Sequence, residues 1–296
     1  MRHRARRDAE ARDVVGEIVA NSSGRTRKLL FEHRRVRVNG RVARPADRVR
    51  AGDVVEIASA SPPADLPPGL DLVHEDADVI VVRKAQNLLT IATPKERERT
   101  AFAYLSAHVK RTRPSAKIFV VHRLDKLASG LVVFAKTPGA KAGLQAQFAA
   151  HTVERIYVAV VSGRIAPPSG TLTSRIEEGE EGRVRETKSE KRGRRAITHY
   201  RVLEEGVKFS LVELKLETGR KNQIRVQLQG IGRPIAGDEP FGSRVDPIRR
   251  LALHARVLAF DHPRTGERLR FEDAIPPPFV GLVRSKPAPR TRSGNA

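Results

Sequence analysis

A proline-rich stretch early in the chain limits how these 296 residues can fold. Residues 61–69 read SPPADLPPG, and proline lacks the backbone N–H and the free φ that a helix interior or a central strand requires. No regular element can continue through this stretch, so we expect a stiff linker between two separately folded parts. The first part is expected over residues 17–60 and the second over residues 70–285.

Both ends of the chain are rich in charge or proline and poor in apolar residues. We expect a basic flexible start over residues 1–16 and a disordered basic tail over residues 286–296. The start mixes acidic residues with its arginines and has no apolar core, which argues against a secretory signal. No apolar run is long enough to cross a bilayer, and the absence of cysteine suits a reducing compartment. We therefore expect a cytoplasmic protein without a membrane partner.

The charge balance indicates the kind of partner. The chain has 56 Lys and Arg against 34 Asp and Glu, a formal charge of +22. This excess favours a polyanionic partner, because cations on a protein release counterions from a phosphate backbone. The alternative is a protein that is basic only because its proteome or its ribosomal surroundings are basic.

The first part combines a basic helix with short strands. Residues 25–33 have helical spacing, residues 36–42 alternate around an Asn-Gly pair typical of a hairpin turn, and residues 54–57 form a further strand. Residues 27–57 resemble the small RNA-binding domain named after ribosomal small-subunit protein four. The resemblance implies that the helix lies along an RNA backbone, and a solvated charged face is the alternative. The basic residues concerned are Arg25, Arg27, Lys28, Arg34 and Arg35.

The second part has many strands and a few helices that do not alternate strictly. This pattern predicts an α+β domain on a mixed, mostly antiparallel sheet with flanking helices, beside the small N-terminal α/β module. The charged residues 176–195 are expected to form a long surface hairpin or a mobile loop. Strands are expected over residues 70–74, 79–83, 155–161, 197–203, 209–216, 256–260 and 268–271, and helices over 100–110, 138–150 and 223–229.

One segment of the second part presents a carboxylate between two expected strands. An apolar run ends at Val121, a largely charged segment over residues 122–126 follows, and a Ser-Gly turn at residues 129–130 begins a second apolar run. Asp125 is therefore expected on a tight connection, which suits a reactive carboxylate and also suits a structural turn aspartate. Two later blocks accompany this segment, namely the strand that holds Tyr157 and residues 217–228, which read ETGRKNQIRVQL.

In order and spacing, these three blocks resemble the motifs of the RluA-type pseudouridine synthases. The similarity covers about residues 70–280 and continues at Gly237-Asp238, at residues 253–255 and at the turn of residues 260–263. It implies the pseudouridine-synthase fold with an active-site cleft. It also implies isomerisation of specific uridines in structured RNA, with ribosomal RNA as the leading substrate and transfer RNA the next. The uracil is detached from its ribose, rotated and rejoined through a carbon atom, so the reaction needs no cofactor.

The resemblance assigns three catalytic residues. Asp125 acts near the sugar, either as a nucleophile or as a base. Arg225 supplies the positive charge that keeps a carboxylate ionised in a water-poor pocket, and Tyr157 packs on the base and helps to move a proton. Asp125 and Arg225 are expected within ion-pair distance, with Tyr157 facing the same cleft. A turn aspartate, a solvent-facing arginine and a core tyrosine are the alternatives.

Five further residues are expected to bind the substrate. The target uridine must leave its stack, and Arg123 matches the residue that fills or holds the gap. Leu228 is expected to form an apolar wall of the pocket, with core packing as the alternative. His122 is expected to belong to the motif and to pack within it. The other two, Arg220 and Gln223, belong to the third block.

The chain also departs from the family pattern. Ala128 replaces a usual Thr, Asn222 a usual His and Phe241 a usual Tyr, and residues 84–87 replace a Lys-Pro-x-Gly turn. An inactive RNA-binding or ribosome-assembly factor on the same scaffold is therefore the competing hypothesis, although the joint presence of the acid, its basic partner and the tyrosine favours the enzyme. The nine histidines show no metal-binding spacing, so we expect no metal, and we expect a monomer.

Overall fold

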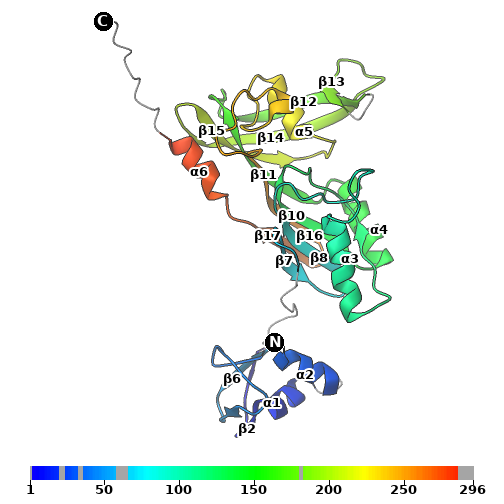
Figure 1. The fold of residues 1–296 in the computed structure, drawn as a ribbon, viewed down its shortest axis with the longest axis vertical. Coiled ribbons are helices and arrows are strands. Elements are labelled where there is room, and N and C mark those ends of the chain that lie inside the picture. The colour runs from blue at the N-terminus through cyan, green and yellow to red at the C-terminus, as the bar shows by residue number, and fades with distance from the viewer. Residues whose placement is uncertain (1, 20–23, 33–35, 58–65, 180–182, 286–296) are drawn as a thin grey trace, which may run out of the picture. The chain divides into compact units, whose positions relative to one another are not determined.

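The computed structural model describes the chain except for residues 1, 20–23, 33–35, 58–65, 180–182 and 286–296. The chain divides into two compact units, residues 1–65 and 66–296 (Figure 1). The boundary falls within the proline-rich stretch, of which residues 61–65 lie outside the described residues, as does the expected tail over residues 286–296. No described helix is long and apolar enough to cross a membrane.

The first unit builds two small sheets and two helices around its own core. Its elements are β1 (Arg2–Arg4), β2 (Ala9–Glu10), α1 (Ala11–Ile18), α2 (Gly24–Glu32), β3 (Val36–Val38), β4 (Arg41–Val42), β5 (Arg48–Val49) and β6 (Val54–Ile57). Strands β1, β6, β3 and β4 form one antiparallel sheet in that order, and β2 pairs with β5. The expected hairpin between β3 and β4 is confirmed, because Asn39 and Gly40 have φ of 48° and 82°, as a type I′ turn requires.

The start of the chain belongs to this unit, which differs from the flexible segment expected over residues 1–16. Strand β1 pairs with β6 from Arg2 opposite Glu56 onward, and Val14 and Val15 of α1 are 2% and 0% exposed. The apolar residues of the segment are sparse among its charges, so local composition concealed them. They become a core only through pairing with strands that come much later in the chain.

The basic residues expected to face RNA are only partly described. On α2, Arg27 is half-buried and Lys28 is exposed. Arg34, Arg35 and the side chain of Arg25 lie outside the described residues.

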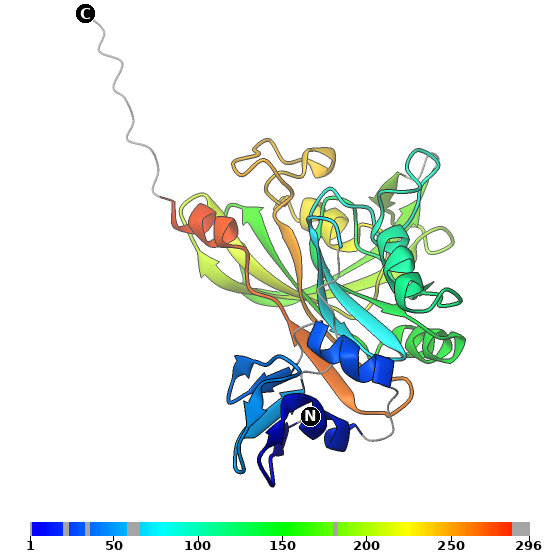
Figure 2. The same cartoon turned by 60° about the horizontal axis from the view of Figure 1, so that its bottom comes forward.

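The second unit is organised around an 11-stranded sheet. Its strands are β7 (Leu70–Glu75), β8 (Val79–Lys84), β9 (Phe119–Val120), β10 (Ser129–Ala135), β11 (Glu154–Ser162), β12 (Ser169–Glu178), β13 (Val184–Glu186), β14 (Arg194–Glu205), β15 (Phe209–Leu216), β16 (Leu253–Asp261) and β17 (Arg268–Glu272). The sheet order is β13-β12-β14-β15-β11-β16-β10-β8-β7, with β17 beside β16 and β9 beside β10. Among the described pairs only β10 with β16 is parallel, so the expected mixed, mostly antiparallel sheet is confirmed (Figure 2).

Helices cover both faces of the central strands (Figure 1). They are α3 (Ala101–Thr112), α4 (Pro138–Ala149), α5 (Gln223–Gly230) and α6 (Pro277–Arg284). Every residue of β10 is buried. Val132 and Phe134 pack in one core with Leu105 of α3, whereas Leu131 packs in another with Leu144 of α4. Because successive side chains of a strand point to opposite faces, a strand covered on both sides appears in the sequence as an unbroken apolar run.

Candidate active site

Asp125 lies on the connection between β9 and β10, where it was expected. The turn is closed by a hydrogen bond from the Ala128 N–H to the Asp125 carbonyl, with an N···O distance of 3.2 Å. Thr90 holds the preceding residue on both backbone groups, because its hydroxyl donates to the Leu124 carbonyl at 2.8 Å and accepts from the Leu124 N–H at 3.2 Å. The backbone that carries the carboxylate is therefore fixed on both sides of Asp125.

A buried lysine fixes this loop through hydrogen bonds to its backbone carbonyls. Lys84 ends β8, is fully buried, and its Nζ donates to the carbonyls of Ala128 at 2.7 Å and Lys126 at 3.4 Å, and to those of Ala85 and Leu88 at 2.9 Å. Burial lowers the pKa of Lys84 to about 7, whereas the charge of Asp125 raises it. The carbonyl acceptors also favour the ammonium form, which has three N–H donors. In the sequence this segment stood out only as a departure from the family pattern.

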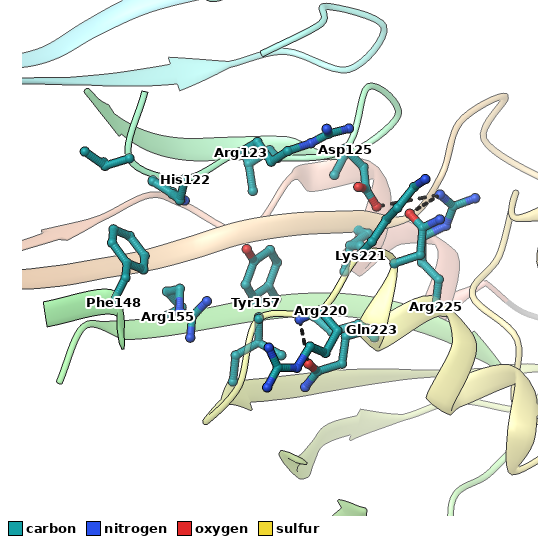
Figure 3. Close-up of a pocket in the computed structure, with 18 of the residues that line it drawn as sticks. His122, Arg123, Asp125, Phe148, Arg155, Tyr157, Arg220, Lys221, Gln223 and Arg225 are labelled. Atoms are coloured by element: carbon teal, nitrogen blue, oxygen red, sulfur yellow. Dashed lines mark hydrogen bonds and ion pairs between the residues drawn. The ribbon is translucent and has the colours of Figure 1, made fainter. Parts of the chain in front are cut away.

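Asp125 meets Arg225 across the cleft, as expected. Asp125 Oδ2 lies 3.6 Å from Arg225 Nη1, and their side chains are 25% and 8% exposed. Arg225 is on α5, far along the chain from Asp125, and Figure 3 shows the two side chains pointing toward each other. The pair places a positive charge beside the carboxylate in a partly desolvated position, where the interaction is less screened than in water.

The sequence did not predict that a second aspartate orients Arg225. Asp238 is fully buried and accepts two hydrogen bonds, from Arg225 Nε at 2.8 Å and from Nη2 at 2.7 Å. The Phe241 ring centre lies 4.3 Å from the guanidinium carbon. Burial alone would lower the pKa of Arg225, but Asp238 and then Asp125 raise it. The Gly237-Asp238 motif was the only signal in the sequence that pointed to this residue.

The turn before α5 also contributes to Arg225. Asn222 has φ of 52°, in the left-handed region that asparagine tolerates better than most residues. Its side-chain oxygen accepts a hydrogen bond from Arg225 Nη1 at 3.1 Å. The departure at Asn222 therefore supplies both a residue that suits the backbone of the turn and a contact to the guanidinium.

Tyr157 faces the same cleft from β11. It is 9% exposed and lines the cleft together with Asp125 and Arg225. Burial raises the pKa of Tyr157 to about 12, with a further contribution from the charge of Asp125, while Arg155 lowers it. The phenol is therefore neutral at physiological pH and can donate its proton in a hydrogen bond.

The cleft has a volume of about 670 Å³, which is in the range of small-molecule and cofactor sites. Of the expected substrate-binding residues, His122, Arg123, Arg220 and Gln223 line it. Arg123 is exposed, two residues before Asp125, and Lys221 adds a further cation to the lining. The lining is therefore predominantly basic, with Asp125 and Glu178 as its carboxylates.

Two of the expected substrate contacts have other roles in the fold. Leu228 is fully buried in the main core and is absent from the lining of the cleft, so its expected role as a pocket wall is wrong and the core alternative holds. Gln223 accepts hydrogen bonds from the Thr218 hydroxyl at 2.8 Å and the Arg220 N–H at 2.9 Å. Its amide nitrogen donates to the Ile197 carbonyl at 3.0 Å, so Gln223 holds the loop before α5.

His122 packs as expected. Its Nε2 accepts a hydrogen bond from the Val133 N–H at 3.1 Å, and its ring stacks on Phe148 with a centroid distance of 4.8 Å. Burial, assisted by the charge of Arg155, lowers the pKa of His122 to about 3. The imidazole is therefore neutral at physiological pH, with its proton on Nδ1.

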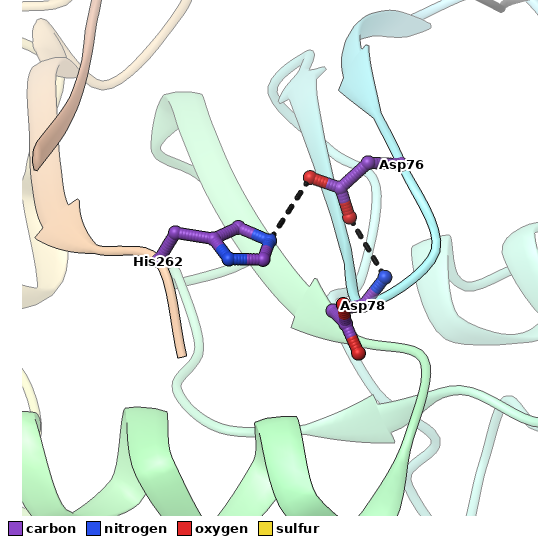
Figure 4. A group of neighbouring side chains, drawn as sticks. All are labelled: Asp76, Asp78 and His262. Atoms are coloured by element: carbon purple, nitrogen blue, oxygen red, sulfur yellow. Dashed lines mark hydrogen bonds and ion pairs between the residues drawn. The ribbon is translucent and has the colours of Figure 1, made fainter. Parts of the chain in front are cut away.

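A separate cluster has the composition of a metal site. Ligand atoms of Asp76, Asp78 and His262 lie within 4.8 Å of one another (Figure 4). Asp76 accepts the backbone N–H of Asp78 and Val79 at 2.7 and 2.8 Å, and its other oxygen lies 3.2 Å from His262 Nε2. Arg264 donates to Asp78, and backbone N–H groups donate to His262 Nδ1. Hydrogen bonds thus account for the arrangement, which joins the turn after β7 to the turn after β16.

Both parts of the chain match known protein families. Residues 78–230 match the family model "RNA pseudouridylate synthase", and residues 29–55 match the model of the S4 domain. The chain is 39% identical over 256 residues to "Uncharacterized RNA pseudouridine synthase YlyB" of Bacillus subtilis, with 83% of this chain and 84% of that protein covered. It is 36% identical over 268 residues to "Ribosomal large subunit pseudouridine synthase D" of Pseudomonas aeruginosa, with 84% and 83% covered.

A solved structure agrees with these relatives. "Human RNA Pseudouridylate Synthase Domain Containing 1" superimposes with a TM-score of 0.59 at 25% identity, covering 72% of this chain and 86% of that one. The fold, the ordered motifs and the acid-arginine cleft define an enzyme that isomerises uridine in RNA. The chain belongs to the RNA pseudouridylate synthase family, and it carries an S4 domain before its catalytic unit.

Proposed function

We propose that this enzyme converts a uridine of large-subunit ribosomal RNA to pseudouridine, with Asp125 as the reacting carboxylate. The observation that carries the proposal is the Asp125-Arg225 pair, 3.6 Å apart, in a basic cleft that Tyr157 also lines. The substrate class is supported by relatives in Pseudomonas aeruginosa and Vibrio cholerae named "Ribosomal large subunit pseudouridine synthase D". Transfer RNA is the next class to test.

The reaction exchanges one bond of the uracil for another. The bond between C1′ of the ribose and N1 of uracil breaks, the base rotates, and a bond forms between C1′ and C5. The C5 hydrogen leaves as a proton and N1 gains one, so there is no net redox change. Asp125 acts either as the nucleophile at C1′ or as the base at the neighbouring sugar carbon, and the nearby Arg225 favours its ionised form in both roles.

Tyr157 and Arg123 complete the proposed site. The ring of Tyr157 packs against the uracil, and its neutral hydroxyl assists the proton movement between C5 and N1. Arg123 is exposed on the loop of Asp125, where it can occupy the position that the target base vacates. Aromatic residues make up only 4% of the chain, so phosphate contacts and RNA shape supply most of the binding.

Release of tritium from RNA labelled at C5 of uracil tests the activity directly. Unmodified transcripts of large-subunit ribosomal RNA and of transfer RNA are incubated separately with the wild-type protein and with Asp125→Asn. We expect release from the ribosomal transcript, none above background with the variant, and RNA affinity within about tenfold of wild type, because the phosphate-binding cations are unchanged. Release from transfer RNA alone would overturn the substrate class. Normal turnover by the variant would overturn the role of Asp125.

A further inference from the structure

The cleft contains a buried cation that the proposed reaction does not use. Arg155 is 8% exposed and lines the cleft. It is two residues before Tyr157 on β11, and residues i and i+2 of a strand point to the same face of a sheet. Figure 3 shows its guanidinium beside the cleft, on the opposite side of Tyr157 from Asp125 and Arg225.

The contacts of Arg155 with the described protein are few and weak. Its Nη2 donates to the Glu217 carbonyl at 3.5 Å, the guanidinium carbon lies 5.5 Å from the Phe148 ring centre, and its Nε is buried without a hydrogen-bond partner. Among the described residues, no carboxylate forms an ion pair with it. Arg225, at the other end of the cleft, instead has two aspartates.

The surroundings make room for this guanidinium and leave it without a counter-ion among the described residues. A Cβ added at Gly219 would lie only 2.4 Å from Arg155 Nη1, so the absent side chain makes room for the cation. Arg220 and Lys221 follow Gly219 along the same wall of the cleft. A buried charge without a counter-ion is unfavourable, and an arginine offers planar, paired donors that match a phosphate.

We propose that Arg155 binds the phosphodiester of a nucleotide that adjoins the target uridine. The inference rests on the proposed function in that the cleft receives RNA. Phosphate is favoured over the base, because an unpaired buried cation calls for a full negative charge and a uracil carbonyl carries only a partial one. The contact would fix the strand on one side of Tyr157 while Asp125 acts on the other. Arg155 would then position the substrate and take no part in the bond exchange.

A charge-removal cycle tests this contact. The probe is the shortest fragment of unmodified large-subunit ribosomal RNA transcript that the full chain binds, resynthesised with one neutral methylphosphonate linkage at a time. Wild type should lose about tenfold or more in affinity at one linkage, as expected for a charge-assisted hydrogen bond. Arg155→Gln should bind the unmodified fragment more weakly than wild type does, and its affinity should fall less than about twofold when that same linkage is neutralised. The difference between the two losses is the coupling between Arg155 and the linkage. Arg155→Lys, which retains the charge, should recover part of the coupling.

Two further variants extend the test, one as a second perturbation of Arg155 and one as a control. Gly219→Ala keeps every charge but displaces the guanidinium, and we expect it to reduce the coupling at the same linkage even if Arg155→Gln proves too unstable to measure. Arg284→Gln removes a cation that already pairs with Glu204 through two hydrogen bonds, and we expect it to leave the coupling unchanged. Far-ultraviolet circular dichroism establishes that each protein is folded.

The outcomes separate the two proposals. Equal losses by wild type and Arg155→Gln at every linkage would overturn the phosphate contact. Coupling to a 4-thiouridine replacement instead of to any linkage would also overturn it, by assigning Arg155 to the base. Because the cycle measures binding alone, the absence of tritium release would count against the proposed reaction and leave the test of Arg155 intact.

Discussion

At the residue scale, Arg225 holds two aspartates in different ways. Asp238 takes two donors of the guanidinium at 2.7 and 2.8 Å, whereas Asp125 lies 3.6 Å from the remaining nitrogen. A bidentate pair fixes the plane of a guanidinium as well as its position. Asp238 therefore acts as a positioning residue, and the looser contact leaves Asp125 able to approach a sugar.

We predict that Asp238→Asn lowers kcat more than about tenfold while KM changes little, since it disturbs the orientation of Arg225 and leaves the cations that hold RNA. The same change should reduce the free energy of unfolding by about 3–5 kcal/mol, as when one partner of a buried pair is removed. Steady-state tritium release and urea unfolding measure the two effects. Asp261→Asn, at an exposed aspartate, is the control, and an unchanged kcat in Asp238→Asn would refute the positioning role.

His122 should make stability depend on pH. Its pKa is about 3 in the folded protein, against about 6.5 for an ordinary histidine. Between these values only the unfolded chain binds the proton, so the free energy of unfolding falls as pH falls, by up to about 1.4 kcal/mol per pH unit. His122→Gln can keep an acceptor for the Val133 N–H but does not titrate, so we expect it to lose less stability than wild type between pH 6.5 and 4.5. Urea unfolding at both pH values checks this, and equal losses would contradict it.

The sequence predicted the site residues that belong to recognisable motifs. Asp125, Tyr157 and Arg225 could be placed in one cleft because the order of their blocks matches a family. The partner role of Asp238 and the isolation of Arg155 could not, because both depend on which side chains the fold brings near a guanidinium. Periodicity offered one hint, since Arg155 shares a strand face with Tyr157.

At the element scale, local residue preferences were sufficient to predict those elements whose ends are set by residues close in the sequence. The helix expected from residue 138 begins there as α4: the Thr137 hydroxyl accepts the Ala140 N–H and Pro138 occupies the first turn, positions in which these two residue types are favoured. The charged residues 176–195, of which 180–182 lie outside the described residues, were expected to form a hairpin or a mobile loop. The described part has strand pairing of the first kind, with β12 paired to β13 and β14. The parallel pairing of β10 with β16 joins distant segments, and no local pattern specifies such a neighbour.

The loop that carries Asp125 is attached to β8 through the hydrogen bonds of one side chain, that of Lys84. We predict that Lys84→Met lowers the free energy of unfolding by at least about 2 kcal/mol, because it removes the donor of one buried and three partly buried carbonyls. We also expect it to lower kcat by loosening the loop. Thermal unfolding and tritium release measure the two effects. Lys110→Met, at an exposed position of α3, is the matched control. A Lys84→Met protein with wild-type stability and wild-type kcat would show that the loop keeps its conformation without the lysine.

At the scale of the whole molecule, the two units have separate hydrophobic cores, so each can be expected to fold without the other. The first unit matches the S4 domain over residues 29–55 and exposes basic residues outside its core, including Arg41, Arg44 and Arg48. The catalytic unit contains the complete cleft. This division assigns the bond exchange to one unit and leaves the other free to contribute phosphate contacts.

We predict that removal of residues 1–65 weakens RNA binding and flattens its salt dependence while the catalytic unit keeps its turnover at saturating RNA. Every phosphate interaction that the truncation removes should reduce the slope of log K against log salt by about 0.7–0.9. Affinity for the ribosomal transcript measured between 50 and 200 mM salt, together with single-turnover tritium release, distinguishes the two effects. The full chain with Arg41→Gln, Arg44→Gln and Arg48→Gln is the matched variant, because it removes cations without removing a domain, and we expect a smaller change of the same sign. An unchanged slope in the shortened protein would exclude the first unit as an RNA-binding arm, and a loss of turnover at saturation would give it a part in assembling the active site.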